Sequence, residues 1–253
     1  MIRKTSLVLT AALAAWLALA PEAHAAEVSV AVAANFAAPM KVIAEDFERA
    51  SGHKVSLSFG ATGQLYAQIR NGAPFAILLS ADDHTPARLE NEGLGMPGSR
   101  FTYAIGRLVL WSKTPGMVDA EGKILMSGSF RRLAVANPKL APYGNAAIET
   151  LQRLGVLDAV RPKFVEGANI GQTFQFVSSG NVSLGFVAMS QVYEHGKLKE
   201  GSAWIVPPQL HSAIRQDAIL LRPSNGNPAA DALLKYLRDP NARATIRAYG
   251  YDL

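Results

Sequence analysis

The spacing of hydrophobic residues changes period along the chain, which predicts strands and helices in alternation. Residues 28–33 form a continuous apolar run, typical of a strand that is buried on both faces. From Met40 to Phe47, apolar residues recur at positions i, i+3, i+4 and i+7, the spacing of one helix face. We expect this helix to end before Gly52, because glycine commonly follows the last turn of a helix.

A second strand and a second helix follow in the same order. The spacing predicts a strand at 54–59, a helix that begins near Gly63 and ends at Asn71, and a buried strand at 75–80. Strands that alternate with helices pair in parallel, because each helix carries the chain back across the sheet. This βαβαβ pattern therefore predicts an α/β fold with a parallel sheet.

The same alternation resumes beyond Gly98, where apolar strand-like segments again alternate with helical spacing. The tail of the chain returns through a short apolar segment to a helical end, which Pro240 divides into two helices. A second α/β unit, followed by a return of the chain to the first, is the simplest interpretation of this pattern.

These two units define the predicted domain organisation. We place one lobe at residues 27–104 plus 211–253, and the other lobe at residues 105–210. The chain must then cross between the lobes twice, near Ile105 and near His211. A length of about 100 residues is enough for a lobe of this kind to bury its own core.

Four loops that lead from strands into helices contain small or neutral residues, two in each predicted lobe. A helix N-terminus leaves backbone N–H groups without intrahelical partners, so it attracts anions. Ligands of open α/β sheets bind at the carboxyl ends of the strands. Two facing lobes would bring all four helix starts to one cleft rich in N–H donors. The loops are Ala34-Asn35, Ala61-Thr62-Gly63, Pro142-Tyr143-Gly144 and Asn169-Ile170-Gly171.

Each of these loops also has an ordinary structural interpretation. Asn35 and Thr62 are residue types that commonly cap helices. The glycines allow tight turns, and Tyr143 beside Pro142 is suited to packing. Only the repetition of the pattern in both halves of the chain favours a binding site over these alternatives.

Residues 1–25 have the organisation of a secretory signal peptide. Two basic residues precede an apolar run, and Ala23 and Ala25 match the small residues of a signal-peptidase site. A membrane anchor is the alternative, but the apolar run is short for a span and Pro21 follows it. We predict cleavage after Ala25, which leaves 228 of the 253 residues and places the mature protein in the periplasm.

The composition of the chain excludes several kinds of binding partner and covalent modification. After cleavage, 23 of the 25 basic and 19 of the 20 acidic residues remain, a net charge of +4. No basic run or basic and aromatic alternation is present, so we expect no nucleic-acid partner. The chain has no cysteine, which excludes disulfides, thiolate metal sites and a lipid-modified N-terminal cysteine. We therefore expect a soluble periplasmic protein.

The residues give little support to an enzyme. The histidines beyond residue 25 show no metal-ligand spacing, and the segment GATGQ lacks the Lys-Ser/Thr pair of a phosphate-binding loop. The sequence around Ser183 lacks the first glycine of a nucleophile elbow. Asp82 and Asp83 follow a strand, where carboxylates usually contact solvent or cap a helix. We predict a binding protein without catalytic residues, cofactor or side-chain metal ligands.

Six segments resemble the periplasmic molybdate-binding proteins of ABC transporters. They are VAVAANF, SFGATGQLYAQI, NGAPFAILLSAD, GSRFTYAIGRLVLWS, NPKLAPYG and ANIGQTFQFV, and they span nearly the whole mature chain in the family's order. The resemblance implies a type II periplasmic binding fold, in which two α/β lobes close on a tetrahedral molybdate or tungstate ion.

The resemblance also implies which residues hold the oxyanion, since the family uses side-chain hydroxyl or amide groups and backbone N–H groups. Asn35 takes the first-loop position, and Thr62 supplies a hydroxyl and an N–H group. Tyr143 supplies its backbone N–H, with or without its hydroxyl, and Ile170 a backbone N–H. Many relatives have serine where Asn35 stands and tyrosine where Ala188 stands, which leaves the fourth side-chain contact open.

The resemblance further implies a monomer that delivers its ligand to an ABC permease in the inner membrane. A site built from donors favours a fully deprotonated dianion, because a protonated oxyanion needs an acceptor for its own O–H group. Sulfate is a dianion too, and only the size of the site distinguishes it from molybdate. A binding protein for another oxyanion such as sulfate is therefore the alternative.

Overall fold

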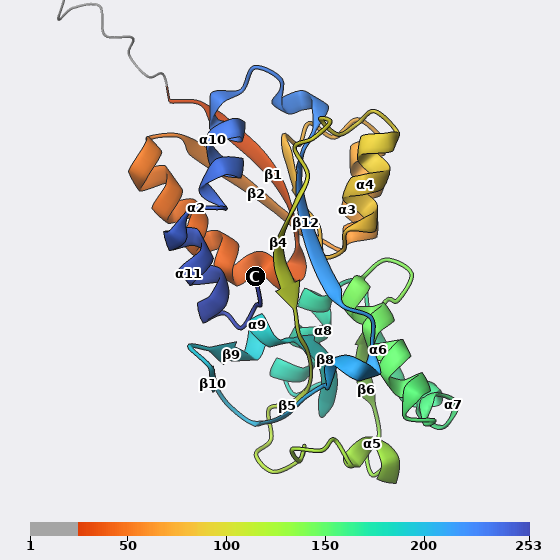
Figure 1. Ribbon diagram of the computed structural model, residues 1–253. Coiled ribbons are helices and arrows are strands. Elements are labelled where there is room, and N and C mark those ends of the chain that lie inside the picture. The colour runs from red at the N-terminus through yellow and green to blue at the C-terminus, as the bar shows by residue number, and fades with distance from the viewer. Residues whose placement is uncertain (1–24) are drawn as a thin grey trace, which may run out of the picture.

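The computed structural model describes residues 25–253, and these form two α/β units built on two five-stranded sheets (Figure 1). All of the predicted signal peptide except Ala25 lies outside the described residues. No helix between residues 25 and 253 is long and apolar enough to cross a membrane.

The first sheet has the strand order β2-β1-β3-β12-β4. Strands β1, β2 and β3 pair in parallel, as the βαβαβ pattern predicts. Strand β12 is antiparallel to both of its neighbours, so the whole sheet is mixed. The bounds are β1 (Glu27–Ala33), β2 (Lys54–Gly60), β3 (Ile77–Leu79), β4 (Phe101–Gly106) and β12 (Ile214–Leu220).

Helices cover both faces of the first sheet. Val30 of β1 lies in a core with Met40 and Phe47 of α2, whereas the next residue, Ala31, lies in a separate core with Leu65 of α3. This alternation follows from the period-2 geometry of a strand. The helices are α2 (Ala37–Ser51), α3 (Thr62–Arg70), α4 (His84–Asn91), α10 (Pro228–Tyr236) and α11 (Pro240–Ala248).

The second sheet has the order β11-β5-β8-β6-β7. Strand β6 is parallel to β7 and β8, while β5 is antiparallel to β8 and to β11. The bounds are β5 (Leu108–Ser112), β6 (Leu133–Ala136), β7 (Phe164–Gly167), β8 (Leu184–Ala188) and β11 (Ser202–Ile205). Two short strands, β9 (Tyr193–Glu194) and β10 (Lys197–Leu198), form a separate hairpin.

The second sheet is also covered on both faces. Leu110 of β5 lies in a core with Leu151 of α6, and its neighbour Trp111 lies in another core with Val177 of α8. The two cores again follow the alternation of a strand. The helices of this unit are α5 (Ile124–Ser127), α6 (Pro142–Arg153), α7 (Leu157–Val160), α8 (Ile170–Ser178) and α9 (Met189–Val192).

Two segments connect the sheets. Strand β4 ends at Gly106 and β5 begins at Leu108, so the chain passes from the first sheet to the second at Arg107 (Figure 1). It returns between β11 and β12, where the short helix η3 (Pro208–Leu210) lies. The predicted lobes are 27–104 plus 211–253 and 105–210, and this division cuts β4, whose Ile105 and Gly106 pair with β12 in the first sheet. The lobe boundaries otherwise remain a prediction.

Candidate functional site

The four loops predicted from the sequence meet at one small cavity between the two sheets. Asn35, Thr62, Tyr143 and Ile170 all line it, and alanines supply much of the remaining wall. The cavity volume is about 10 Å³, which is about the space that one water molecule needs. All four site residues are at most 3% exposed. Each comes from the start of a helix, respectively η1 (Ala34–Phe36), α3, α6 and α8.

The hydroxyl oxygen of Thr62 already accepts a hydrogen bond within the protein. The backbone N–H of Ala81 donates to Thr62 Oγ1 at 3.0 Å, and the hydroxyl proton has no acceptor among residues 25–253. Thr62 is the first residue of α3, and Ala61 occupies the cap position, so the capping role considered for Thr62 is excluded. The hydroxyl proton of Thr62 is therefore available to a ligand in the cavity.

Asn35 lies in η1 and makes no capping bond with its side chain, which excludes the capping role considered for it as well. Its Nδ2 donates to Gln216 Oε1 at 2.8 Å and to the Tyr251 hydroxyl at 3.0 Å. An amide nitrogen has two protons, and both are engaged here. What Asn35 offers to the cavity is its backbone N–H, since the first N–H groups of a helix lack intrahelical partners.

Tyr143 is the second residue of α6 and is 1% exposed. Its hydroxyl accepts from Gln216 Nε2 at 3.2 Å. Burial raises the pKa of Tyr143 well above its ordinary value, and the neighbouring Tyr251 and Tyr103 add to the rise. The phenol is therefore neutral and keeps its proton, which makes it a hydrogen-bond donor.

Ile170 begins α8 and contributes only backbone groups. Asn169 is the N-cap, and its side-chain oxygen accepts from the N–H of Gln172 at 2.9 Å. The cap satisfies that donor, so the earlier N–H groups of the helix, including that of Ile170, remain for a ligand. The carbonyl of Ile170 accepts from Gln191 Nε2 at 3.1 Å, which ties this loop to α9.

Three residues of the site were missed from the sequence: Gln216, Tyr251 and Ser190. Gln216 and Tyr251 hold the amide of Asn35, and Ser190 Oγ donates to the carbonyl of Asn35 at 2.7 Å. The Tyr251 hydroxyl lies 2.8 Å from the same carbonyl. A polar residue inside the apolar segment of β12 was the available signal for Gln216. No local pattern indicates the other two.

Hydrogen bonds join the two lobes on either side of the cavity. On one side Ser190, which follows β8, bonds to Asn35 of the first unit. On the other side the N–H of Gly63 donates to the carbonyl of Leu140 at 2.9 Å. The cavity is therefore closed in this structure, because groups from both sheets seal it.

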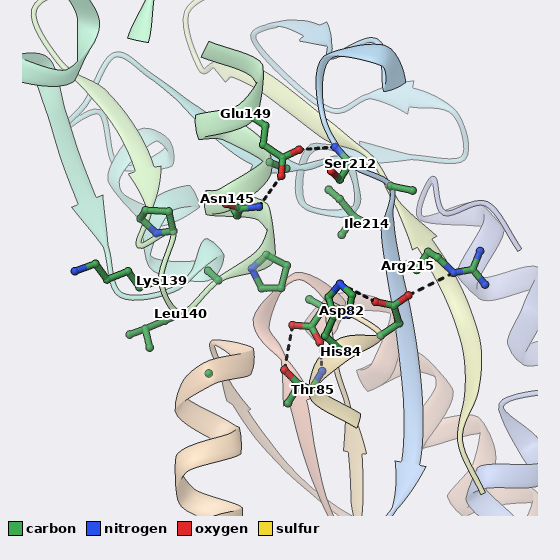
Figure 2. Close-up of a pocket in the computed structure, with 18 residues that line it drawn as sticks. Asp82, His84, Thr85, Lys139, Leu140, Asn145, Glu149, Ser212, Ile214 and Arg215 are labelled. Atoms are coloured by element: carbon green, nitrogen blue, oxygen red, sulfur yellow. Dashed lines mark hydrogen bonds and ion pairs between the residues drawn. The ribbon is translucent and has the colours of Figure 1, made fainter. Parts of the chain in front are cut away.

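A larger groove of about 270 Å³ adjoins the cavity and shares Ala81, Ala141 and Pro142 with it. Figure 2 shows the groove with its charged side chains. Its lining is charged, and most of its charged groups pair with one another or with polar groups, while Lys139 is exposed to solvent. Asp83 lies 3.7 Å from Arg215, and Glu149 accepts from the N–H of Ser212. Burial raises the pKa of Asp82. The charged groups thus lie beside the cavity, and its own lining carries none.

The comparisons with known proteins agree with this geometry. A family model described as bacterial extracellular solute-binding protein matches residues 28–252. The molybdate-binding protein ModA of Azotobacter vinelandii is 58% identical over 235 residues, 93% of each chain. The molybdate-binding protein ModA of Rhodobacter capsulatus is 48% identical over 240 residues, 95% of this chain and 94% of the relative.

A solved structure agrees as well. The periplasmic molybdate-binding protein of Azotobacter vinelandii superposes with a TM-score of 0.87 at 40% identity, over 89% of this chain and 99% of that one. The fold and its matches define a solute-binding protein with two α/β lobes. The chain belongs to the bacterial extracellular solute-binding proteins, in the same family as these molybdate-binding proteins.

Three predictions are confirmed by these findings. The two-lobed periplasmic binding fold is confirmed by the structural match, and the family resemblance is confirmed by the identity with molybdate-binding relatives. The prediction of a binding protein rather than an enzyme is confirmed by the family, whose described role is solute binding. The roles of Asn35, Thr62, Tyr143 and Ile170 remain predictions.

Proposed function

We propose that the mature chain binds molybdate or tungstate in the cavity between its lobes. The observation that supports this most directly is the direction of two hydrogen bonds. Thr62 Oγ1 accepts from Ala81, and the Tyr143 hydroxyl accepts from Gln216, so each is oriented as a donor. The Thr62 proton is available directly, and that of Tyr143 is shared with the Tyr251 hydroxyl until a ligand binds. A cavity lined by donors and by no formal charge is suited to a dianion.

The binding mechanism replaces water by fixed dipoles. The hydroxyls of Thr62 and Tyr143 and the backbone N–H groups of Asn35 and Ile170 donate to the four oxygens of the ion. Each charge-assisted hydrogen bond contributes about 1.5–3 kcal/mol. No buried cation is needed, and this also lets the ion leave when the lobes separate.

The protein then acts as the periplasmic receptor of a transporter. Residues 1–25 direct secretion and are cleaved, and the monomeric mature chain takes up its ligand in the periplasm and delivers it to an ABC permease in the inner membrane. The relatives that are named as molybdate-binding, one of them periplasmic, support this role. Opening occurs by a hinge near Ile105 and His211, close to the two segments that connect the sheets.

Sulfate is the second candidate, because the same donors suit any tetrahedral dianion. The identity with two molybdate-binding relatives favours molybdate over sulfate. The deciding property is the size of the closed cavity, since a smaller ion leaves donors unmatched and a larger one keeps the lobes apart.

One calorimetric titration series tests the proposal. The protein cleaved after Ala25 is titrated with molybdate, tungstate, sulfate and phosphate, and we expect tight binding of the first two and weak binding of the others. In a parallel melting experiment, a ligand at a thousandfold excess over its Kd adds about 4 kcal/mol to the free energy of unfolding. A melting temperature that rises with sulfate and is unchanged by molybdate would overturn the assignment.

A further inference from the structure

We propose that Gln216 is a positioning residue that makes the Tyr143 hydroxyl a donor to the bound oxyanion. The inference rests on the proposed function and extends it to a residue that lies behind the cavity wall. Gln216 belongs to β12, is fully buried, and is not among the residues that line the cavity. Its effect on a ligand must therefore pass through the residues that it contacts.

The two ends of the Gln216 amide face different partners. Oε1 accepts from Asn35 Nδ2 at 2.8 Å and lies 3.0 Å from the Tyr103 hydroxyl, while Nε2 donates to the Tyr143 hydroxyl at 3.2 Å. A hydroxyl that accepts through its oxygen keeps its single proton for another acceptor. Tyr143 lines the cavity, and its proton already has the neighbouring Tyr251 hydroxyl as a partner. We propose that the oxyanion takes this proton from Tyr251 when it binds.

The surrounding structure holds the Gln216 side chain in this place. Gln216 and Asp217 are neighbours on β12 and are both buried, because helices cover both faces of the sheet. The pairing of β12 with β4 shifts register between these two residues. Asp217 instead accepts from Arg100 and Thr102, both at 2.7 Å. Such irregularities re-aim side chains beside functional sites, and here the shift separates an ion pair from the neutral site.

Gly106 leaves the space in which Tyr143 and Gln216 meet. A Cβ atom at this position would overlap the Tyr143 hydroxyl, and it would lie 2.6 Å from Gln216 Nε2. Glycine here has no requirement for a positive φ, since Gly106 is not among the glycines with that conformation. The absence of a side chain at Gly106 is therefore explained by the approach of these two polar groups.

The opposite amide direction makes a different prediction. If Oε1 of Gln216 faced Tyr143, it would take the phenol proton, and Tyr143 would no longer donate to the ligand. Nε2 would then face Asn35 and turn the amide of Asn35 so that its Nδ2 is free to donate. Gln216 would act on binding through Asn35 in that case, and through Tyr143 in the direction that the structure shows.

A double-mutant cycle separates these directions. The Kd for molybdate is measured by calorimetry for Gln216→Met, Tyr143→Phe and the double variant, and then for Asn35→Ala alone and with Gln216→Met. Methionine keeps the length of glutamine and removes both polar atoms. We expect Gln216→Met to weaken binding about tenfold and Tyr143→Phe ten- to a hundredfold, with the double variant within about threefold of Tyr143→Phe.

Two more variants show whether the effect is one of position rather than of stability. Asp217→Asn breaks a buried ion pair on the same strand, and it should lower the melting temperature while the Kd changes less than threefold. Gly106→Ala deletes no polar group but moves Tyr143 away from Gln216, and it should weaken molybdate binding about tenfold. Folding of each variant is checked by circular dichroism.

The possible outcomes decide the proposal. The proposal is wrong if the affinity losses of Gln216→Met and Tyr143→Phe multiply in the double variant, because the two residues would then act independently. It is also wrong if Gln216→Met is coupled to Asn35→Ala and not to Tyr143→Phe. A weakened Kd in Asp217→Asn equal to that in Gln216→Met would also overturn it, because the effect would then be structural. If the wild-type protein binds sulfate and not molybdate, the proposed function fails, and the same cycle with sulfate still tests Gln216. A protein that binds neither anion overturns both.

Discussion

The small cavity and the groove beside it lie between the same two lobes, yet their walls differ in charge. The cavity is lined by neutral groups from four helix starts, whereas the groove has Asp82, His84, Lys139, Glu149 and Arg215 (Figure 2). The cavity is closed by hydrogen bonds between the lobes, and the groove is more than ten times larger. Charge and burial are thus separated within one cleft.

This separation has a physical reason. A buried cation opposite the ligand would have to be desolvated in the empty protein, and that cost is several kcal/mol for a single ion. Hydroxyl and N–H groups cost less to bury, because other protein groups satisfy their acceptor sides, as Ala81 does for Thr62. Most charged groups of the groove stay near water, and the more buried Asp82 accepts hydrogen bonds from Ser80 and Thr85.

The largest expected effect comes from placing a charge in the cavity. Thr62→Asp removes a donor and adds a carboxylate beside the bound dianion, whose repulsion at about 4 Å is about 4 kcal/mol for each pair of unit charges. We expect molybdate affinity to fall at least a thousandfold, measured by calorimetry. The uncharged Thr62→Val should lose only about ten- to a hundredfold, for the missing hydrogen bond.

The matched control lies in the groove. Asp83→Asn removes a charge that pairs with Arg215 and His84, at a position that does not line the cavity. Its molybdate affinity should stay within about threefold of the wild type. If Thr62→Asp bound molybdate as well as Thr62→Val does, the view of the cavity as a site that excludes negative side chains would be wrong.

The cavity also shows which features of the structure can be predicted from the sequence. Periodicity predicts most strands and helices, and the four loops with helix starts predict which residues line the cavity. These features are local, because each depends on a few neighbouring residues. The antiparallel insertion of β12 between β3 and β4 is not local, and periodicity predicts only the parallel pairing of β1, β2 and β3.

The residues behind the cavity wall could not be predicted from the sequence, because their contacts are also not local. Gln216 meets Asn35 across 181 positions of the chain, and Tyr251 meets it across 216. A glutamine in an apolar segment and a tyrosine near the end of the chain have no pattern that pairs them with Asn35. Only the folded structure shows that both protons of the Asn35 amide are engaged.

The second prediction sharpens the comparison by removing one donor without adding charge. Tyr143→Phe keeps the ring and deletes the hydroxyl, so molybdate binding should weaken by about 1.5–3 kcal/mol, ten- to a hundredfold in Kd. Tyr66→Phe is the control, because the Tyr66 hydroxyl bonds to Glu92 on the exposed surface. Unaltered affinity in Tyr143→Phe would show that the phenol is not a ligand group.

The third prediction concerns a hydrogen bond that joins the two lobes beside the cavity. Ser190→Ala removes the hydrogen bond from Ser190 Oγ to the carbonyl of Asn35, while Tyr251 still donates to that carbonyl. One neutral hydrogen bond contributes about 0.5–1.5 kcal/mol, so we expect the Kd for molybdate to rise about two- to tenfold. The change should lie in the dissociation rate, measured by stopped-flow fluorescence, because the bond forms only after closure.

The smallest expected effect is that of the positive charges of the groove. Lys139 and Arg215 line the groove that adjoins the cavity, but they do not line the cavity itself. Exposed charges of this kind attract an anion over a distance of about one Debye length, so they raise the association rate more than the affinity. Lys139→Ala combined with Arg215→Ala should therefore slow association with molybdate about two- to threefold at low ionic strength, and the difference should vanish at 0.5 M salt. The dissociation rate should stay unchanged, because neither side chain lines the closed cavity. A salt-independent rise of the dissociation rate in this variant would mean that the groove holds part of the ligand, and that the neutral cavity is not the whole site.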